Sequence, residues 1–150
     1  ISSGMAHIIT SLLESVVQRG TAKKVRSLGR PTAGKTGTTN NYIDAWFLGY
    51  TPKLLTGVWV GKDNVDPLGK NETGSRAAIP IWLDYMKSAL DKTPVHNFPV
   101  TTETVFAKIN PDTGRLTDSE DSKGYFEIFL KDNLPNKQNS QPEIITSTNF

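Results

Sequence analysis

Two residue types on which many enzymes depend are absent or rare in this sequence. Its 150 residues include no cysteine and two histidines, His7 and His96. A chain without cysteine forms no disulfide framework, no thiolate zinc site and no thiol nucleophile. Two isolated histidines do not predict a catalytic zinc site, so we expect both to pack or to face solvent. We therefore expect neither a metal nor a cofactor.

The sequence also lacks a long apolar run and a large excess of either charge. No stretch approaches the ~18 consecutive apolar residues of a membrane-spanning helix. The first residues lack the basic start and apolar run of a signal peptide, and the internal Met5 leads us to expect a chain that begins within a longer protein. The 17 Lys+Arg and 15 Asp+Glu residues give a net charge of +2, which does not predict a nucleic-acid partner.

The residues that are present predict an α+β domain. Apolar residues recur at helical spacing over 5–17 and over 79–90, where Pro80 is acceptable in the first turn. Segments 43–50 and 54–60 are rich in aromatic and β-branched residues, which is typical of two strands joined by a short connection. Because both segments are almost continuously apolar, we expect both faces of this antiparallel sheet to be covered.

The composition predicts four parts of the chain. Residues 1–92 contain the elements above, and the Pro-flanked residues 93–99 have the composition of a linker. Residues 100–135 contain two further short strands and predict a small β appendage. Residues 136–150 are rich in Asn, Gln, Ser and Thr, and we expect a disordered tail there.

The densest chemical motif, Gly34–Asn40, has two interpretations. Residues Gly29–Thr36 match the phosphate-loop pattern G-x-x-x-x-G-K-[ST] at each fixed position. That loop follows a buried strand and opens a helix, but Lys23–Leu28 do not resemble a buried strand. The residues after Gly37 are poor helix formers. A nucleotide site is therefore the weaker interpretation.

The second interpretation places Lys35-Thr36-Gly37 on a strand that faces an acyl-transfer site. Lys35 would attract a substrate carboxylate. The hydroxyls of Thr36 and Thr38 would lie on one face of the strand and bind the same group. Gly37 has no side chain and would let another backbone approach. A backbone N–H of this strand would supply half of an oxyanion hole.

The longer sequence Lys35–Pro52, KTGTTNNYIDAWFLGYTP, resembles the transpeptidase domain of class A penicillin-binding proteins. The resemblance covers about residues 5–92, and residues 100–135 resemble the small β extension that follows this domain. It implies an α+β fold in which helices cover an antiparallel sheet, as in the C-terminal half of the penicillin-binding protein and serine β-lactamase fold. Asp44, Trp46 and Phe47 match the strand behind the motif, where we expect hairpin packing rather than catalysis.

The resemblance implies D,D-transpeptidation. A serine attacks the D-Ala-D-Ala bond of a peptidoglycan stem peptide, the acyl group passes to an amine, and β-lactams acylate the same serine. Lys35, Thr36, Gly37 and Thr38 match the substrate-binding strand, and the Thr38 N–H matches the oxyanion donor. The family further implies a bacterial cell-envelope location facing the periplasm or cell exterior, a membrane anchor in an upstream region and an attached glycosyltransferase domain.

The sequence departs from this family in one decisive respect. The family needs a Ser-x-x-Lys nucleophile and a Ser-x-Asn upstream of Lys-Thr-Gly, and neither occurs before Lys35. A nucleophile must contact its base to react, so we expect a fragment that binds substrate but is inactive without the N-terminal part of its domain. One alternative is a non-catalytic interaction module that retains the fold. A nucleic-acid role for the basic loop at 19–30 is disfavoured because no aromatic residue lies among its charges.

Overall fold

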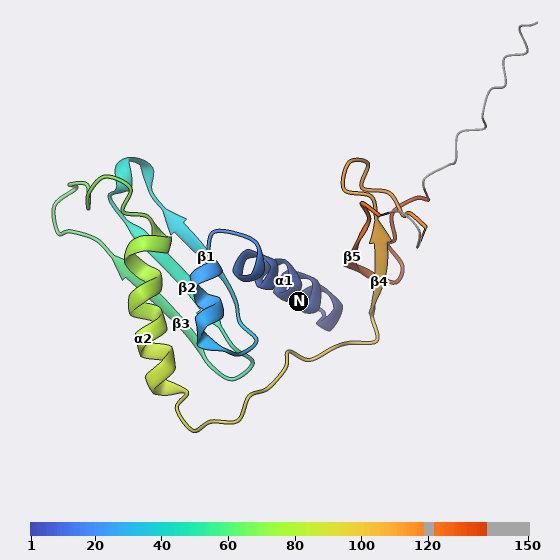
Figure 1. Ribbon diagram of the computed structural model, residues 1–150, viewed down its shortest axis with the longest axis horizontal. Coiled ribbons are helices and arrows are strands. Elements are labelled where there is room, and N and C mark those ends of the chain that lie inside the picture. Colours follow the sequence, from blue (N-terminus) through green and yellow to red (C-terminus); the bar gives the residue numbers. More distant parts are fainter. Residues whose placement is uncertain (119–121, 138–150) are drawn as a thin grey trace, which may run out of the picture. The chain divides into compact units, whose positions relative to one another are not determined.

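The computed structural model describes residues 1–118 and 122–137, which form two compact units that divide between Thr101 and Thr102. The first unit contains the predicted motif, two long helices and a three-stranded sheet (Figure 1). None of the helices among the described residues is long and apolar enough to cross a bilayer.

The first helix, α1 (Ser3–Gln18), starts and ends at signals that the sequence contains. The Ser2 hydroxyl accepts a hydrogen bond from the Met5 N–H at 3.2 Å and caps the first turn. Beyond Arg19, the N–H of Gly20 returns to the carbonyl of Val16 at 3.0 Å. The predicted helix over 5–17 is confirmed, with about one further residue or two at each end.

The sheet consists of β1 (Ala33–Thr38), β2 (Ala45–Tyr50) and β3 (Leu55–Val60), in that order and antiparallel throughout. Lys35 lies opposite Leu48 in the register of β1 and β2. The Gly-Lys-Thr sequence therefore lies within an extended strand. A phosphate-binding loop would instead open a helix here, so the structure excludes that interpretation.

Helix α2 (Ile79–Ala89) covers one face of this sheet and forms the core with it. Pro80 occupies its first turn, as predicted, and a short π-helix at Gly74–Ala78 precedes it. The ring of Trp82 meets that of Phe47 edge to face, 5.1 Å between centroids, and its Nε1 donates to the Thr56 carbonyl at 3.0 Å. These contacts hold α2 on β2 and β3, with both rings fully buried.

The prediction that both faces of the sheet are covered holds only in part, because the face opposite α2 is covered at Tyr50, whose hydroxyl lies 3.0 Å from that of Thr10 on α1, but is exposed further along the strands. On the face opposite α2, Trp46, Leu48 and Trp59 are 42%, 50% and 50% exposed. Trp46 and Trp59 lie opposite each other across β2 and β3, with their rings 6.2 Å apart. The described residues therefore cover the Tyr50 end of this face and leave the side chains of Trp46, Leu48 and Trp59 exposed.

The basic segment after α1 is more regular than the predicted loop. Residues Lys23–Leu28 form a 3₁₀ helix, which Gly29 ends in the left-handed conformation at φ 72°. Val25 is fully buried and anchors this helix in the core, while the charged side chains around it are exposed. Glycine at position 29 suits the left-handed turn because it has no Cβ to strain.

The segment after α2, residues 90–101, contacts other elements of the first unit and belongs to it. The ring of Phe98 meets that of Tyr50 edge to face at 5.5 Å, and the Thr101 hydroxyl lies 3.1 Å from that of Ser3. The residues predicted as a linker, 93–99, therefore run along the first unit in this structure.

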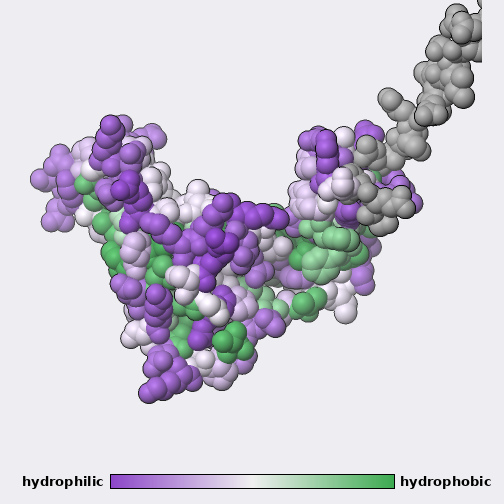
Figure 2. Space-filling view, in the orientation of Figure 1, coloured by the Kyte–Doolittle hydropathy of each residue, from purple (hydrophilic) through white to green (hydrophobic). Residues whose placement is uncertain are grey.

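The second unit is built on a hairpin of β4 (Thr104–Ile109) and β5 (Tyr125–Leu130), which confirms the two predicted strands. Figure 2 shows a hydrophobic patch over this hairpin, where Phe106 and Phe126 are exposed. Leu116 forms a β-bridge with Lys137, so residue 137 of the predicted tail lies against this unit. The rest of the predicted tail, 138–150, lies outside the described residues.

Candidate active site

The predicted substrate strand, β1, lies at an edge of its sheet. The Thr39 N–H donates to the Asp44 carbonyl at 3.1 Å, which continues the β1–β2 ladder by one hydrogen-bonded pair. Bonded and non-bonded pairs alternate in an antiparallel ladder. The N–H and C=O groups of Thr36 and Thr38 therefore point away from β2. Within residues 1–118 and 122–137 no other strand pairs with β1, so these groups face an open edge.

Lys35 carries a positive charge to this edge. Its Nζ donates to the carbonyl of Thr36 at 2.9 Å, and that carbonyl points away from β2. The side chain is exposed and starts from the face of β1 opposite α2. An ammonium held at an open backbone edge is suited to attract the carboxylate of a bound peptide.

The Thr36 side chain has a partner that the sequence did not indicate. Its hydroxyl oxygen lies 2.8 Å from the hydroxyl oxygen of Thr21, in the loop after α1. Each hydroxyl has one hydrogen to donate, so only one of the two hydrogens is used between them. The pair therefore keeps a second O–H for a ligand at the edge. No local sequence signal pairs residues that are 15 positions apart.

The Thr38 side chain is held from the other direction. Its hydroxyl accepts a hydrogen bond from the Gly74 N–H at 3.1 Å, at the start of the π-helix that leads into α2. A hydroxyl that accepts from a backbone N–H can still donate its own hydrogen. Thr36 and Thr38 thus lie on the same face of β1, and Lys35 and Gly37 lie on the opposite face.

Close packing on both faces of β1 depends on two glycines, Gly74 and Gly37. A Cβ at Gly74 would collide with the Trp46 carbonyl and lie 2.8 Å from that of Gly37, both in the ladder beneath it. A Cβ at Gly37 would lie 3.2 Å from the Cβ of Trp46. Glycine at position 37 therefore has a packing reason within the chain, in addition to the predicted approach of a substrate.

Asp44 organises the turn that follows β1. Its carboxylate accepts from the Trp59 Nε1 at 2.9 Å and from the Thr39 hydroxyl at 3.2 Å. The Asp44 N–H in turn donates to the Thr39 hydroxyl oxygen at 2.8 Å. The carboxylate thereby ties the end of β1 to β3, and its contacts are those of a structural residue in the hairpin.

The open edge of β1 has the backbone and side-chain groups that suit the binding of an extended peptide. A peptide added as a strand would pair with the N–H and C=O of Thr38, with Lys35 and two hydroxyls within the same edge. The sequence contains no Ser-x-x-Lys. Within the described part of the chain, no group of three or more His, Asp and Glu residues could hold a metal ion.

Comparison with known proteins points to one family. The family model described as "Penicillin binding protein transpeptidase domain" matches residues 1–87, which contain α1, the whole sheet and most of α2. The chain is 41% identical over 143 residues to penicillin-binding protein 1A of Pseudomonas aeruginosa, which covers 95% of this chain and 17% of that protein. It is 44% identical over 124 residues to penicillin-binding protein 1A of Aquifex aeolicus, covering 83% of this chain and 17% of that protein.

A solved structure supports the same relationship. The crystal structure of penicillin-binding protein 1A from Haemophilus influenzae superimposes with a TM-score of 0.83 and is 31% identical in sequence. The match covers 92% of this chain and 22% of that one. The chain thus spans about a fifth of the length of the relatives that it matches.

The contact at Gly74 provides a test of how the strand is held. We expect Gly74→Ala to lower the free energy of unfolding by about 1–3 kcal/mol, because the added methyl group overpacks the β1–β2 ladder. The Thr38 amide resonance should shift in the same variant, because the bond from the Gly74 N–H to the Thr38 hydroxyl is displaced.

The matched control is Gly57→Ala, whose Cβ would meet only the Leu48 Cγ at 3.7 Å, an ordinary contact. Urea denaturation and amide NMR spectra measure both effects. Equal behaviour of the two variants would show that Gly74 does not support β1.

Proposed function

Because the chain belongs to the penicillin-binding protein transpeptidase family, we propose that it forms the substrate-binding wall of a peptidoglycan D,D-transpeptidase. In the reaction, a serine oxygen loses its proton to a base and forms an ester with the penultimate D-alanine, and the terminal D-alanine leaves as an amine. An amine of a second stem peptide then breaks the ester, and the serine regains its proton. β-Lactams acylate the same serine.

The open edge of β1 is the observation that carries this proposal. A stem peptide ends in a carboxylate, and the Lys35 ammonium with the hydroxyls of Thr36 and Thr38 offers it charge-assisted hydrogen bonds. The Thr38 N–H points away from β2 at the open edge. It is suited to donate to the oxygen that becomes negative in the tetrahedral intermediate. One such donor is typically worth ~2.7–4 kcal/mol of transition-state stabilisation.

Thr21 joins this wall through its hydroxyl bond to Thr36. The bond restricts the rotamer of the Thr36 side chain, which lowers the entropic cost of ordering that side chain when a carboxylate binds. Thr21 is a positioning residue in this proposal, because it acts through Thr36.

The serine and its base lie, in this proposal, in an N-terminal part of the same domain. Two observations support this. The sequence has no Ser-x-x-Lys or upstream Ser-x-Asn, and Trp46, Leu48 and Trp59 form an uncovered apolar sheet face. Exposed apolar patches commonly mark surfaces that another element covers. The N-terminal part would cover this face and bring the serine to the edge of β1.

The wider setting of the protein follows from the same proposal. The complete protein would act in the bacterial cell envelope, anchored in the cytoplasmic membrane by its upstream region and facing the periplasm or cell exterior. It would bind peptidoglycan stem peptides and β-lactams, use no cofactor and carry a glycosyltransferase domain. The alternative is an interaction module that keeps the fold without catalysis.

Fluorescent penicillin distinguishes these alternatives. We expect no covalent labelling of the 150-residue chain, because its sequence contains no Ser-x-x-Lys to supply a nucleophile beside its base. The protein extended at its N-terminus should be labelled on a serine upstream of Ile1, as located by mass spectrometry of the tryptic peptides.

Labelling of the isolated chain, for example at Ser75 near the start of α2, would contradict the assignment of the nucleophile to the upstream part. Absence of labelling in the extended protein, with native circular dichroism, would favour the interaction module.

Lys35 can be tested in the extended protein. We expect Lys35→Ala to reduce the second-order rate of acylation by about 10- to 100-fold, the loss of one charge-assisted hydrogen bond of roughly 1.5–3 kcal/mol. Stopped-flow fluorescence with a labelled penicillin measures this rate. Lys87→Ala, which removes an exposed charge from α2, is the matched control. Equal rates for the two variants would remove Lys35 from the site.

A further inference from the structure

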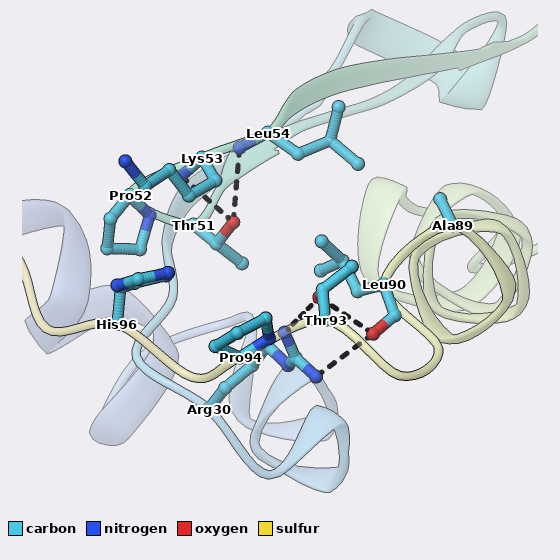
Figure 3. Close-up of a pocket in the computed structure, with 10 residues that line it drawn as sticks. All are labelled: Arg30, Thr51, Pro52, Lys53, Leu54, Ala89, Leu90, Thr93, Pro94 and His96. Carbon is cyan, nitrogen blue, oxygen red and sulfur yellow. Dashed lines mark hydrogen bonds between the residues drawn. The ribbon is translucent and has the colours of Figure 1, made fainter.

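A separate cavity of about 380 Å³ lies at the other end of the sheet (Figure 3). Thr51 lines it directly after Tyr50, which pairs with Ala33 at the start of β1, whereas Thr38 ends that strand. Ala33 and Thr38 are five residue steps apart on an extended strand, roughly 17 Å. The cavity is therefore not a part of the β1 edge around Thr38.

Three segments of the first unit build this cavity. They are the β2–β3 connection, the C-terminal end of α2 with the residues after it, and the loop that enters β1. Half of the ten lining residues are apolar, and these come from the first two of the three segments: Pro52, Leu54, Ala89, Leu90 and Pro94. The volume lies in the range of about 300–1,000 Å³ that is typical of small-molecule sites.

The lining contains basic side chains and no acidic one. Arg30, Lys53 and His96 line the cavity, and no carboxylate does. Figure 3 shows Arg30 held in place from one side, where its Nη1 donates to the Thr93 hydroxyl at 3.1 Å and its Nη2 to the Leu90 carbonyl at 3.2 Å.

The partners of Arg30 leave its charge available. Both acceptors are neutral, and the Thr93 hydroxyl itself donates to the Leu90 carbonyl at 2.8 Å, so the three groups form a closed network. A guanidinium has five N–H donors, of which this network uses two. This hydrogen-bond network thus fixes the plane of the Arg30 guanidinium. It leaves further N–H donors beside the apolar part of the cavity.

The geometry points to a binding site for a small carboxylate with an apolar body. Its hydrocarbon part packs between Pro52, Leu54 and Pro94, and its carboxylate binds to the remaining Arg30 donors, with His96 as a second donor at the mouth. Binding removes apolar surface from water and neutralises an arginine whose partners carry no formal charge. This site is independent of the proposed transpeptidase function and requires no covalent step.

Octanoate is a suitable probe, with octanol as its uncharged analogue. Isothermal titration calorimetry on the N-terminally extended protein should show octanoate binding at least about tenfold more tightly than octanol, since a charge-assisted hydrogen bond is lost in the alcohol. Arg30→Gln should remove this preference. Ala89→Phe, which places a ring into the lining from α2, should abolish binding of both probes. Lys35→Ala should leave octanoate binding unchanged, which separates this cavity from the β1 edge.

Lys87→Gln is the matched control, since it removes a positive charge from α2 outside the cavity lining. Should Arg30→Gln fail to fold, His96→Gln tests the same preference from an exposed residue and should reduce it severalfold. Equal binding of octanoate and octanol, or octanoate binding that survives Ala89→Phe but not Lys35→Ala, would overturn the assignment.

Discussion

The pairing of β1 with β2 along one edge only is the constraint on which the candidate site depends. An antiparallel ladder uses the backbone groups of every second residue, so pairing through Gly37 and Thr39 leaves those of Thr36 and Thr38 on the free side. A shift of one residue would exchange these sets and turn Lys35 to the other face. The register therefore sets which N–H can meet a developing oxyanion and where the ammonium lies.

Several contacts around β1 maintain that register. Gly74 presses on the ladder from the α2 side and holds the Thr38 hydroxyl, while Asp44 ties the turn after β1 to Trp59 on β3. The buried Phe47–Trp82 pair fixes β2 on α2. The core thus supports a strand whose functional groups are themselves exposed, which is a common arrangement in binding sites placed on rigid elements.

The sequence predicted the local structure well where the apolar periodicity and the secondary-structure propensities were strong. The apolar spacing of α1 and the β-branched and aromatic residues of β2 and β3 each appear in the structure as expected. The 3₁₀ helix at Lys23–Leu28 was missed because its exposed basic residues have no apolar period.

Long-range features were beyond the reach of the sequence for a different reason. The Thr21–Thr36 bond and the cavity beside Arg30 join segments that only the tertiary fold brings together. The apolar side chains of Trp46 and Leu48 indicated a covered face, but they carry no information on which segment covers it. The predicted roles of Lys35, Thr36, Gly37 and Thr38 came from the family resemblance, and the structure adds the directions of their donors.

In the acylated protein, we expect the Thr38 N–H to donate to the ester carbonyl oxygen and the Lys35 ammonium to bind the carboxylate. A crystal structure of the N-terminally extended protein, acylated by a penicillin, tests it most directly. We expect the ester carbonyl oxygen at about 2.7–3.1 Å from the Thr38 nitrogen, the distance typical of an oxyanion donor. The penicillin carboxylate should lie against Lys35 and Thr36. An acyl group whose carbonyl oxygen lies away from the edge of β1 would contradict the account.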